Sequence, residues 1–78
     1  MRITLLPHAT EQMQLRHVSE DQVRQTVEDP ARAWQGRLRR IIAERSYGAR
    51  TIRVIYNVGT DEAVVVTVVS RRSRGGGP

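Results

Sequence analysis

The pattern of apolar and polar residues changes along this 78-residue chain. Over about the first thirty residues, apolar positions recur three or four residues apart, which is typical of amphipathic helices. From about residue 31 onwards apolar and polar residues alternate, which is typical of strands with two different faces. A first helix is expected at residues 7–16. Pro7 suits the first helical turn, and Ala9 and Met13 follow it at helical spacing.

A second helix is marked by a clear start and a clear end. Ser19 can cap its first turn, and Gln22 lies three residues later, where it can complete a capping box. Val18 and Val23 occupy the two positions of a hydrophobic staple. The Asp29–Pro30 step ends the helix, because proline disfavours helical geometry in the residue before it.

The alternating part of the chain predicts four strands, at residues 31–36, 38–47, 51–58 and 63–71. Gly48 and residues 59–62 mark the tight turns between the later strands. On the last strand, Val64, Val66 and Val68 are expected on one face and Val65, Thr67 and Val69 on the other. Because both faces are apolar, this strand is expected to be central in the sheet or to form a dimer contact.

Two helices followed by a strand meander predict an α+β fold, with both helices on one face of an antiparallel sheet of three to four strands. The chain is short enough for a single domain, expected at residues 1–71, with a flexible, basic, glycine-rich tail at residues 72–78. The sheet face opposite the helices is expected to be basic and solvent-facing, carrying Arg53 and either Arg39 or Arg40.

Charge divides the chain at the same place as the hydrophobic pattern. Residues 1–31 hold three arginines against five acidic residues, a net charge of −2, whereas residues 32–78 hold ten arginines against three, a net charge of +7. All cationic side chains are arginine, whose guanidinium group binds phosphate or carboxylate through two hydrogen bonds at once. RNA and an acidic protein are therefore the first partners to consider.

Composition also narrows the chemistry. The chain has no cysteine, which excludes disulfides, thiolate zinc sites and thiol nucleophiles. His8 and His17 match no metal-ligand spacing, so neither a metal nor another cofactor is expected. No apolar run approaches the length of a membrane span, and a cytoplasmic protein without membrane contact is expected.

The main candidate site is the arginine-rich strand region. Several guanidinium groups would meet where strands pair, and they could bind RNA or stabilise charge during phosphodiester cleavage. A charged, solvated face that prevents edge-to-edge aggregation is the alternative. Arg53 is the sharpest candidate, because a charge at mid-strand among β-branched residues is costly without a partner.

Other polar residues have both a functional and a structural interpretation. His8 lies near a helix start, where a neutral imidazole would suit a general base, although a helix-end hydrogen-bonding role is more common. Tyr47 near a turn could donate a proton, whereas Tyr56 is expected in the core. Trp34 is expected to anchor the core or a sheet edge. His17 is expected to be structural, at a helix end that needs left-handed backbone.

The order of these residues resembles the uncharacterised bacterial family called domain of unknown function 4258, over about residues 6–70. The resemblance rests on His8–Ala9, Met13, Arg16, Val18–Ser19, Val23, Asp29–Pro30, Gly36–Arg37, Arg39–Arg40, Thr51–Ile52–Arg53–Val54 and Val65–Val66–Thr67–Val68. That family is similar to the RelE/ParE-like toxins, which implies two helices on a curved antiparallel sheet. Some of those toxins are metal-independent endoribonucleases, and others poison gyrase.

The resemblance also implies site residues. His8, Arg16, Arg53 and Thr67 fall on recurring positions of the family, and Arg39 or Arg40 falls in its basic second strand. Gln12 stands where arginine is usual, which would remove a phosphate contact, and His17 stands where glycine is usual. The terminal catalytic helix or tyrosine-bearing tail of some RelE-type nucleases is not recognisable, which argues against strong ribosome-dependent cleavage.

The leading hypothesis is a toxin-like, metal-independent endoribonuclease or RNA-binding protein that acts through a basic sheet face. Arg53 and Arg40 would neutralise the scissile phosphate, His8 would assist attack by the ribose 2′-hydroxyl, and Tyr47 would donate a proton. RNA contacts are assigned to Arg16, Arg39, Arg45, Arg50, Thr67, Arg71 and Arg72. The alternatives are a non-catalytic module that docks an acidic antitoxin or regulator, and a homodimer formed through strand 63–70.

Overall fold

The computed structural model describes residues 1–72 of the chain, and it has the expected α+β architecture. The tail expected at residues 72–78 lies outside this part except for Arg72, which belongs to the last strand. In chain order the elements are β1 (Arg2–Leu5), α1 (Pro7–Arg16), α2 (Glu20–Glu28), β2 (Arg32–Gln35), the 3-10 turn η1 (Arg37–Arg39), β3 (Ile41–Tyr47), β4 (Arg50–Gly59) and β5 (Glu62–Arg72).

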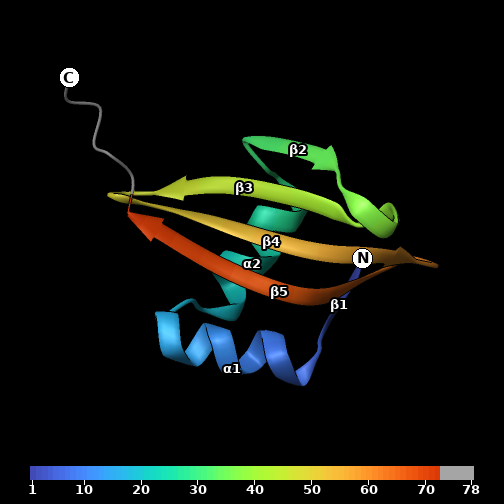
Figure 1. Cartoon of the computed structure of the whole chain (residues 1–78), viewed down its shortest axis with the longest axis horizontal. Coiled ribbons are helices and arrows are strands. Elements are labelled where there is room, and N and C mark those ends of the chain that lie inside the picture. The colour runs from blue at the N-terminus through green and yellow to red at the C-terminus, as the bar shows by residue number, and fades with distance from the viewer. Residues whose placement is uncertain (73–78) are drawn as a thin grey trace.

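The strands form one sheet in the order β1-β5-β4-β3-β2 (Figure 1). The antiparallel meander from β2 to β5 was expected, but the sheet has five strands and is mixed, because β1 pairs parallel to β5. The sequence prediction missed β1, since its alternating run is only four residues long and its partner lies about sixty residues away. β5 is internal to the sheet, as its apolar faces suggested.

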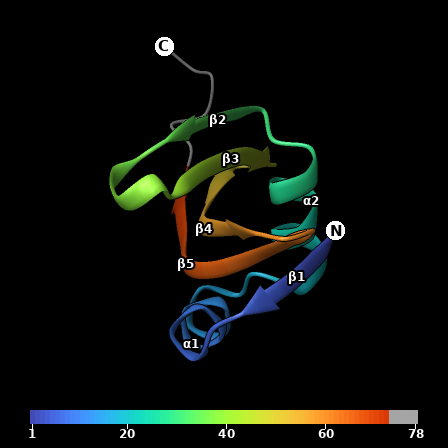
Figure 2. The same cartoon turned by 90° about the vertical axis from the view of Figure 1, so that its right-hand side faces the viewer.

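The two helices cover the sheet from one side (Figures 1 and 2). α1 packs mainly against β5, and α2 packs against β4 and β3. Both helices begin as expected. Pro7 is the first residue of α1, and Ser19 and Gln22 form the capping box of α2. His17 has the expected left-handed backbone at the end of α1, with φ of 54°.

The core lies between the helices and the sheet and consists mostly of small aliphatic side chains. Its fully enclosed members are Ala9, Val23, Ala43, Ile52, Val54, Ala63, Val65 and Val68. Tyr56 is also buried there, as expected. Burial raises the pKa of the Tyr56 phenol, because the charged form is poorly solvated.

The expected alternation on β5 was wrong in one respect. Val65 and Val68 both face the core, although they are three residues apart. A bulge explains this, because Ile55 pairs with Thr67 whereas its neighbour Tyr56 pairs with Val65, which leaves Val66 without a directly opposed residue. The extra residue shifts the alternation, so that Thr67 and the residues after it lie on the face opposite to the one expected.

The expected strand at residues 38–47 also begins later than predicted. Residues 37–39 form the turn η1, in which Leu38 and Arg39 have positive φ angles of 57° and 60°. The amide of Gly36 donates to the carbonyl of Arg40 and closes this turn. Arg39 and Arg40 therefore lie in or beside a turn and not within β3, which corrects their expected place on the sheet face.

Candidate functional site

The sheet face opposite the helices, here called the open face, holds the densest group of charged side chains on the sheet. On β4, Ile52 and Val54 point into the core, so Arg53 between them points to the open face. The register aligns three cross-strand rows of side chains on this face. They are Trp34, Ile42, Ile55 and Thr67; then Arg32, Glu44, Arg53 and Val69; then Ser46, Thr51 and Arg71.

Glu44 is the centre of this face. It lies on β3, directly opposite Arg53 on β4 and Arg32 on β2, and only 7% of it is exposed. Arg53 donates from Nε to Oε2 at 2.7 Å and from Nη2 at 2.5 Å. Arg32 donates to Oε1 at 3.1 Å, and Arg71 approaches Oε2 at 3.4 Å. Three guanidinium groups thus surround one buried carboxylate.

This arrangement decides the ionisation of Glu44. Burial by itself would raise the pKa of the carboxyl group, but the hydrogen bond from Arg53 and the charges of Arg53, Arg32 and Arg71 outweigh it. The pKa of Glu44 is therefore lowered below its ordinary value of 4.5. Glu44 is ionised at neutral pH, and the cluster keeps a net charge of +2.

Trp34 joins the cluster from the edge strand β2. The guanidinium carbons of Arg32 and Arg53 lie 5.1 and 5.3 Å from its ring centroid, within the range of cation–π attraction. Trp34 keeps 37% of its surface exposed. It is an edge residue, as expected, but it belongs to the open face and not to the core.

Half-buried aliphatic side chains adjoin the charged cluster. Ile42 and Ile55 are cross-strand partners beside Trp34, and Val69 lies opposite Arg53. The helices pack on the other side of the sheet, so within residues 1–72 no helix covers this combination of apolar and guanidinium groups. Such a combination is typical of a protein-binding surface.

The structure brings only some of the predicted site residues together. Arg53, Thr67 and Arg71 share the open face. His8 is an exposed residue in the first turn of α1, on the helical side of the sheet. The sheet therefore separates the imidazole from Arg53, and the structure does not form the catalytic pair that the sequence suggested.

Tyr47 also faces the helices. Its hydroxyl donates to the carbonyl of Gln22 at 3.0 Å and lies 3.0 Å from the hydroxyl of Thr26. Both contacts are to α2, so Tyr47 fastens this helix to the end of β3. In this position it is not available to donate a proton on the face that carries Arg53.

Arg40 and Arg39 do not accompany Arg53 either. Arg40 lies four residues before Glu44, about 13 Å along an extended strand. Its Nε is buried and has no hydrogen-bond partner among the described residues. Arg39 is exposed in η1. The predicted pairing of Arg53 with Arg40 at one phosphate is therefore not formed.

Two other arginines that were assigned to RNA are bound within the protein. Arg45 donates to the carbonyl and the carboxylate of Asp29 at the end of α2. Arg50 donates to the carbonyls of Arg16 and His17 at the end of α1, at 2.8 and 2.6 Å. The side chain of Arg16 is exposed on α1, and that of Arg72 is exposed at the end of β5.

Sequence reasoning missed Glu44, Arg32 and the role of Trp34. One signal was present, because Glu44 is the only acidic residue between positions 32 and 60. An acidic residue at mid-strand in so basic a segment requires a cationic neighbour. Its neighbours are fixed by the strand register, which aligns Glu44 with Arg32 and Arg53 and which local sequence does not specify.

Two further observations concern metals and membranes. Within residues 1–72, no group of three or more histidine, aspartate or glutamate side chains is arranged to hold a metal ion. Neither α1 nor α2, the helices of that same part of the chain, is long and apolar enough to cross a membrane.

Comparison with known proteins identifies a family. The sequence matches the family described as domain of unknown function DUF4258 over residues 5–70, nearly the whole chain. Comparison with curated proteins gave no significant match. Comparison with solved structures gave none either.

Proposed function

This chain belongs to the family described as domain of unknown function DUF4258, and from that premise we propose that its open face binds an acidic, amphipathic segment of a partner protein. The proposal rests above all on one observation, the group of Arg32, Arg53 and Arg71 around the buried Glu44. The partner segment would place carboxylates on these arginines and apolar side chains on the aliphatic row beside them.

The chemistry of the face supports a protein partner. Tryptophan and arginine are the residues that most often dominate binding energy at protein interfaces, and Trp34 lies within cation–π distance of two arginines. Ile42 and Ile55 supply an adjoining apolar strip, which a helix or strand with one apolar side would cover. RNA gains little from such aliphatic side chains, because bases bind mainly by stacking on aromatic rings.

Glu44 supports the proposal as a positioning residue. It holds three guanidinium groups in place before a partner arrives, which reduces the entropy lost when they are ordered on binding. Because it neutralises only one of three positive charges, the surface keeps a net attraction for carboxylates. Arg32 and Arg71 remain 69% and 62% exposed in their side chains and are the groups within reach of the partner.

We extend the proposal to a toxin-type protein of RelE/ParE-like fold, bacterial and cytoplasmic, whose acidic partner is an antitoxin-like protein. Two N-terminal helices on one face of a sheet with an antiparallel meander support this relationship. The relationship supports an inference about the fold more strongly than one about the activity, since one fold hosts many functions.

RNA binding is a second candidate, carried by a different surface. Arg37 and Arg39 in η1 are exposed, and no acidic side chain among residues 1–72 pairs with them. These arginines could contact the phosphate backbone of RNA without any catalytic residues nearby. RNA cleavage has weaker support than RNA binding, because His8 and Tyr47 lie on the other side of the sheet from Arg53.

The proposed function is tested by NMR titration of the ¹⁵N-labelled protein with two synthetic peptides. One alternates glutamate with leucine, and the other has glutamine in place of glutamate. We expect the acidic peptide to shift the amide signals of β3 and β4 around Glu44 and Arg53 and to change the fluorescence of Trp34, the only tryptophan. The glutamine peptide should have little effect.

A matched pair of variants makes the test specific to this face. Arg71→Gln removes a guanidinium group from the open face, and Arg24→Gln removes one from α2. Only Arg71→Gln should weaken binding of the acidic peptide. Equal weakening by both variants, or shifts of the open face by single-stranded RNA but not by the acidic peptide, would contradict the proposal.

A further inference from the structure

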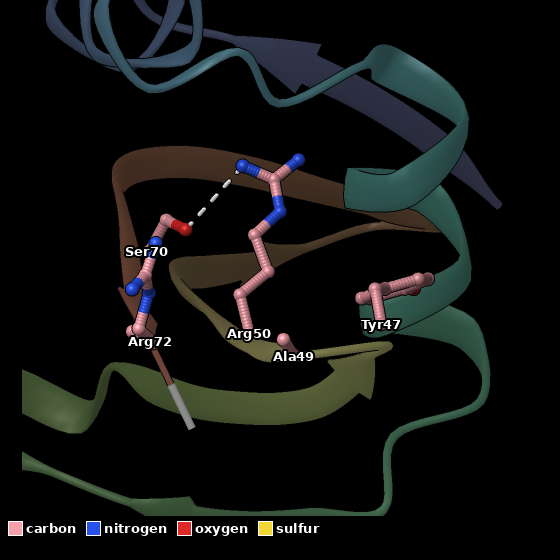
Figure 3. A pocket seen from close by; sticks show the side chains of 5 residues that line it. All are labelled: Tyr47, Ala49, Arg50, Ser70 and Arg72. Atoms are coloured by element: carbon pink, nitrogen blue, oxygen red, sulfur yellow. Dashed lines mark hydrogen bonds between the residues drawn. The ribbon is translucent and has the colours of Figure 1, made fainter. Parts of the chain in front are cut away.

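A pocket lies at the end of the sheet, on the helical side and away from the open face. It has a volume of about 420 Å³ and is lined by Tyr47, Ala49, Arg50, Ser70 and Arg72. Arg50 lies between Ser70 and Arg72 on one side and Tyr47 on the other (Figure 3). The volume falls in the range of pockets that hold small molecules.

The charges in this pocket are unbalanced. Arg50 on β4 and Arg72 on β5 are directly opposed in the strand register. Like charges in this relation repel each other, and the cost is relieved when an anion lies between them. None of the residues that line the pocket is acidic. The site therefore has two cations and lacks a counter-ion of its own among the described residues.

Arg50 is already fixed in position, but its charge is not neutralised. Its terminal nitrogens donate to the carbonyls of Arg16 and His17, to the amide oxygen of Gln22 and, at 3.5 Å, to the hydroxyl of Ser70. All of these acceptors are uncharged, and the end of α1 supplies only about half a negative charge. The Nε–H of Arg50 stays unbonded among residues 1–72.

Arg72 and Ser70 supply the remaining donors. The side chain of Arg72 is exposed and makes no hydrogen bond or ion pair within the described part of the chain. Its guanidinium group can grip two oxygens of one anion at once. The Ser70 hydroxyl lies on the same face of β5, two residues away, and can donate to a third oxygen.

We propose that this pocket binds a phosphate monoester, with the phosphate group held by Arg72, the Nε–H of Arg50 and the hydroxyl of Ser70. The fixed guanidinium of Arg50, the exposed guanidinium of Arg72 and the hydroxyl of Ser70 together suit a tetrahedral oxyanion with three free oxygens. The phosphate can belong to a free nucleotide or to the 5′ end of an RNA, and both sources present the same group. This site is separate from the open face and does not depend on the acidic partner.

The test is an NMR titration of the full chain at constant ionic strength, with inorganic phosphate and then adenosine 5′-monophosphate. We expect saturable shifts of the Arg50 Nε–H signal and of the Ser70 and Arg72 amides. Arg72→Gln should weaken binding about tenfold or more. Its matched control is Arg71→Gln, which removes the same charge one residue away on the opposite face and should leave the affinity within about twofold.

RNA oligonucleotides with a 5′-phosphate or a 5′-hydroxyl distinguish the two sources. Tighter binding of the phosphorylated RNA identifies an RNA end, and binding of the nucleotide alone identifies a small molecule; both support the site. Shifts that do not saturate, or equal weakening by Arg71→Gln and Arg72→Gln, would overturn it. Because the acidic peptide acts on the open face, failure here leaves the proposed function standing.

Discussion

At the scale of single residues, Glu44 determines the character of the open face. It is a buried carboxylate whose pKa is held below 4.5 by surrounding arginines, in spite of the opposing effect of burial. A carboxyl group with a lowered pKa in the folded state stabilises the fold at pH values above its unfolded pKa. That stabilisation is lost as the pH falls through the folded pKa.

Replacing Glu44 tests this directly. We expect Glu44→Gln to lower the free energy of unfolding at pH 7 by about 1–3 kcal/mol, because Arg53 and its neighbours lose a charged acceptor. The difference between the two proteins should shrink as the pH falls below 4.5, where Glu44 of the original protein also becomes neutral. Urea unfolding at a series of pH values measures this. A difference that stays constant down to pH 2 would contradict it.

Arg53 illustrates how local sequence gives a residue's orientation but not its partner. The alternation of Ile52, Arg53 and Val54 correctly predicts that the guanidinium points away from the core. The sequence interpretation then assigned it to a phosphate. The register of β3 and β4 instead places Glu44 directly opposite, at hydrogen-bonding distance.

At the scale of elements, Arg50 connects the first residues of β4 to both helices. It donates to the last carbonyls of α1, which have no partner within the helix, and to Gln22 of the α2 capping box. The Arg50 side chain therefore caps the C-terminal end of α1, although it belongs to a strand far away in the sequence. The junction between α1 and α2 depends on it.

Removing that connection should cost stability. We expect Arg50→Met to lower the free energy of unfolding by about 1–3 kcal/mol, because the carbonyls of Arg16 and His17 lose their charged donor while most of the apolar stem is kept. Arg24→Met on the exposed side of α2 is the control and should change it by less than about 0.5 kcal/mol. Thermal or urea unfolding followed by circular dichroism compares them. Equal effects would mean that Arg50 contributes no more than an ordinary surface arginine.

Gln12 is a second link between a helix and the sheet. Its side-chain oxygen accepts a hydrogen bond from the Val68 amide at 3.0 Å, beyond the point where β1 ends and can no longer pair with β5. The resemblance to relatives with arginine here suggested a lost phosphate contact. In this chain the glutamine has a structural contact instead.

Hydrogen exchange tests the contribution of Gln12. We expect Gln12→Ala to speed exchange of the Val68 amide by about tenfold, because this donor loses the side-chain oxygen that accepts its hydrogen bond. Gln14→Ala, at an exposed position of the same helix, should leave that rate unchanged. Slow exchange of Val68 in both variants would show that the strand protects this amide without help from α1.

At the scale of the whole molecule, the sheet divides the chemistry into two sides. His8, Tyr47 and the Arg50 pocket lie with the helices, whereas Arg53, Glu44 and Trp34 lie on the open face. β1 pairs with β5 only at residues 62–65, so a homodimer through backbone pairing of strand 63–70 would have to use the edge of β5 beyond Val65.

This division predicts the outcome of an RNA cleavage assay. Incubation of the protein with a defined RNA in EDTA should leave the RNA intact, because the proposed base and the proposed phosphate-binding arginine are on opposite sides of the sheet. Analysis of fragment ends checks this against His8→Ala and Arg53→Ala. Cyclic-phosphate ends that vanish in both variants would establish a ribonuclease and contradict the expectation that His8 and Arg53 cannot act together.

The sequence by itself determined the helices, most of the strands and the orientation of Arg53. Caps, helical spacing and alternation are local properties, so Pro7, Ser19 and Gln22 could be interpreted without knowledge of the rest of the chain. The charge division at residue 31 was equally visible. These features fixed the α+β class and the basic character of the sheet.

The tertiary structure decided which side chains meet. The parallel pairing of β1, the bulge at Val66 and the contact between Arg50 and the end of α1 join residues far apart in the chain. The cluster around Glu44 depends on the register of four strands, and a shift of one residue would send each side chain to the other face. Register and the placing of helices are settled by packing of the whole chain, which is why local pattern predicted the elements but not the sites.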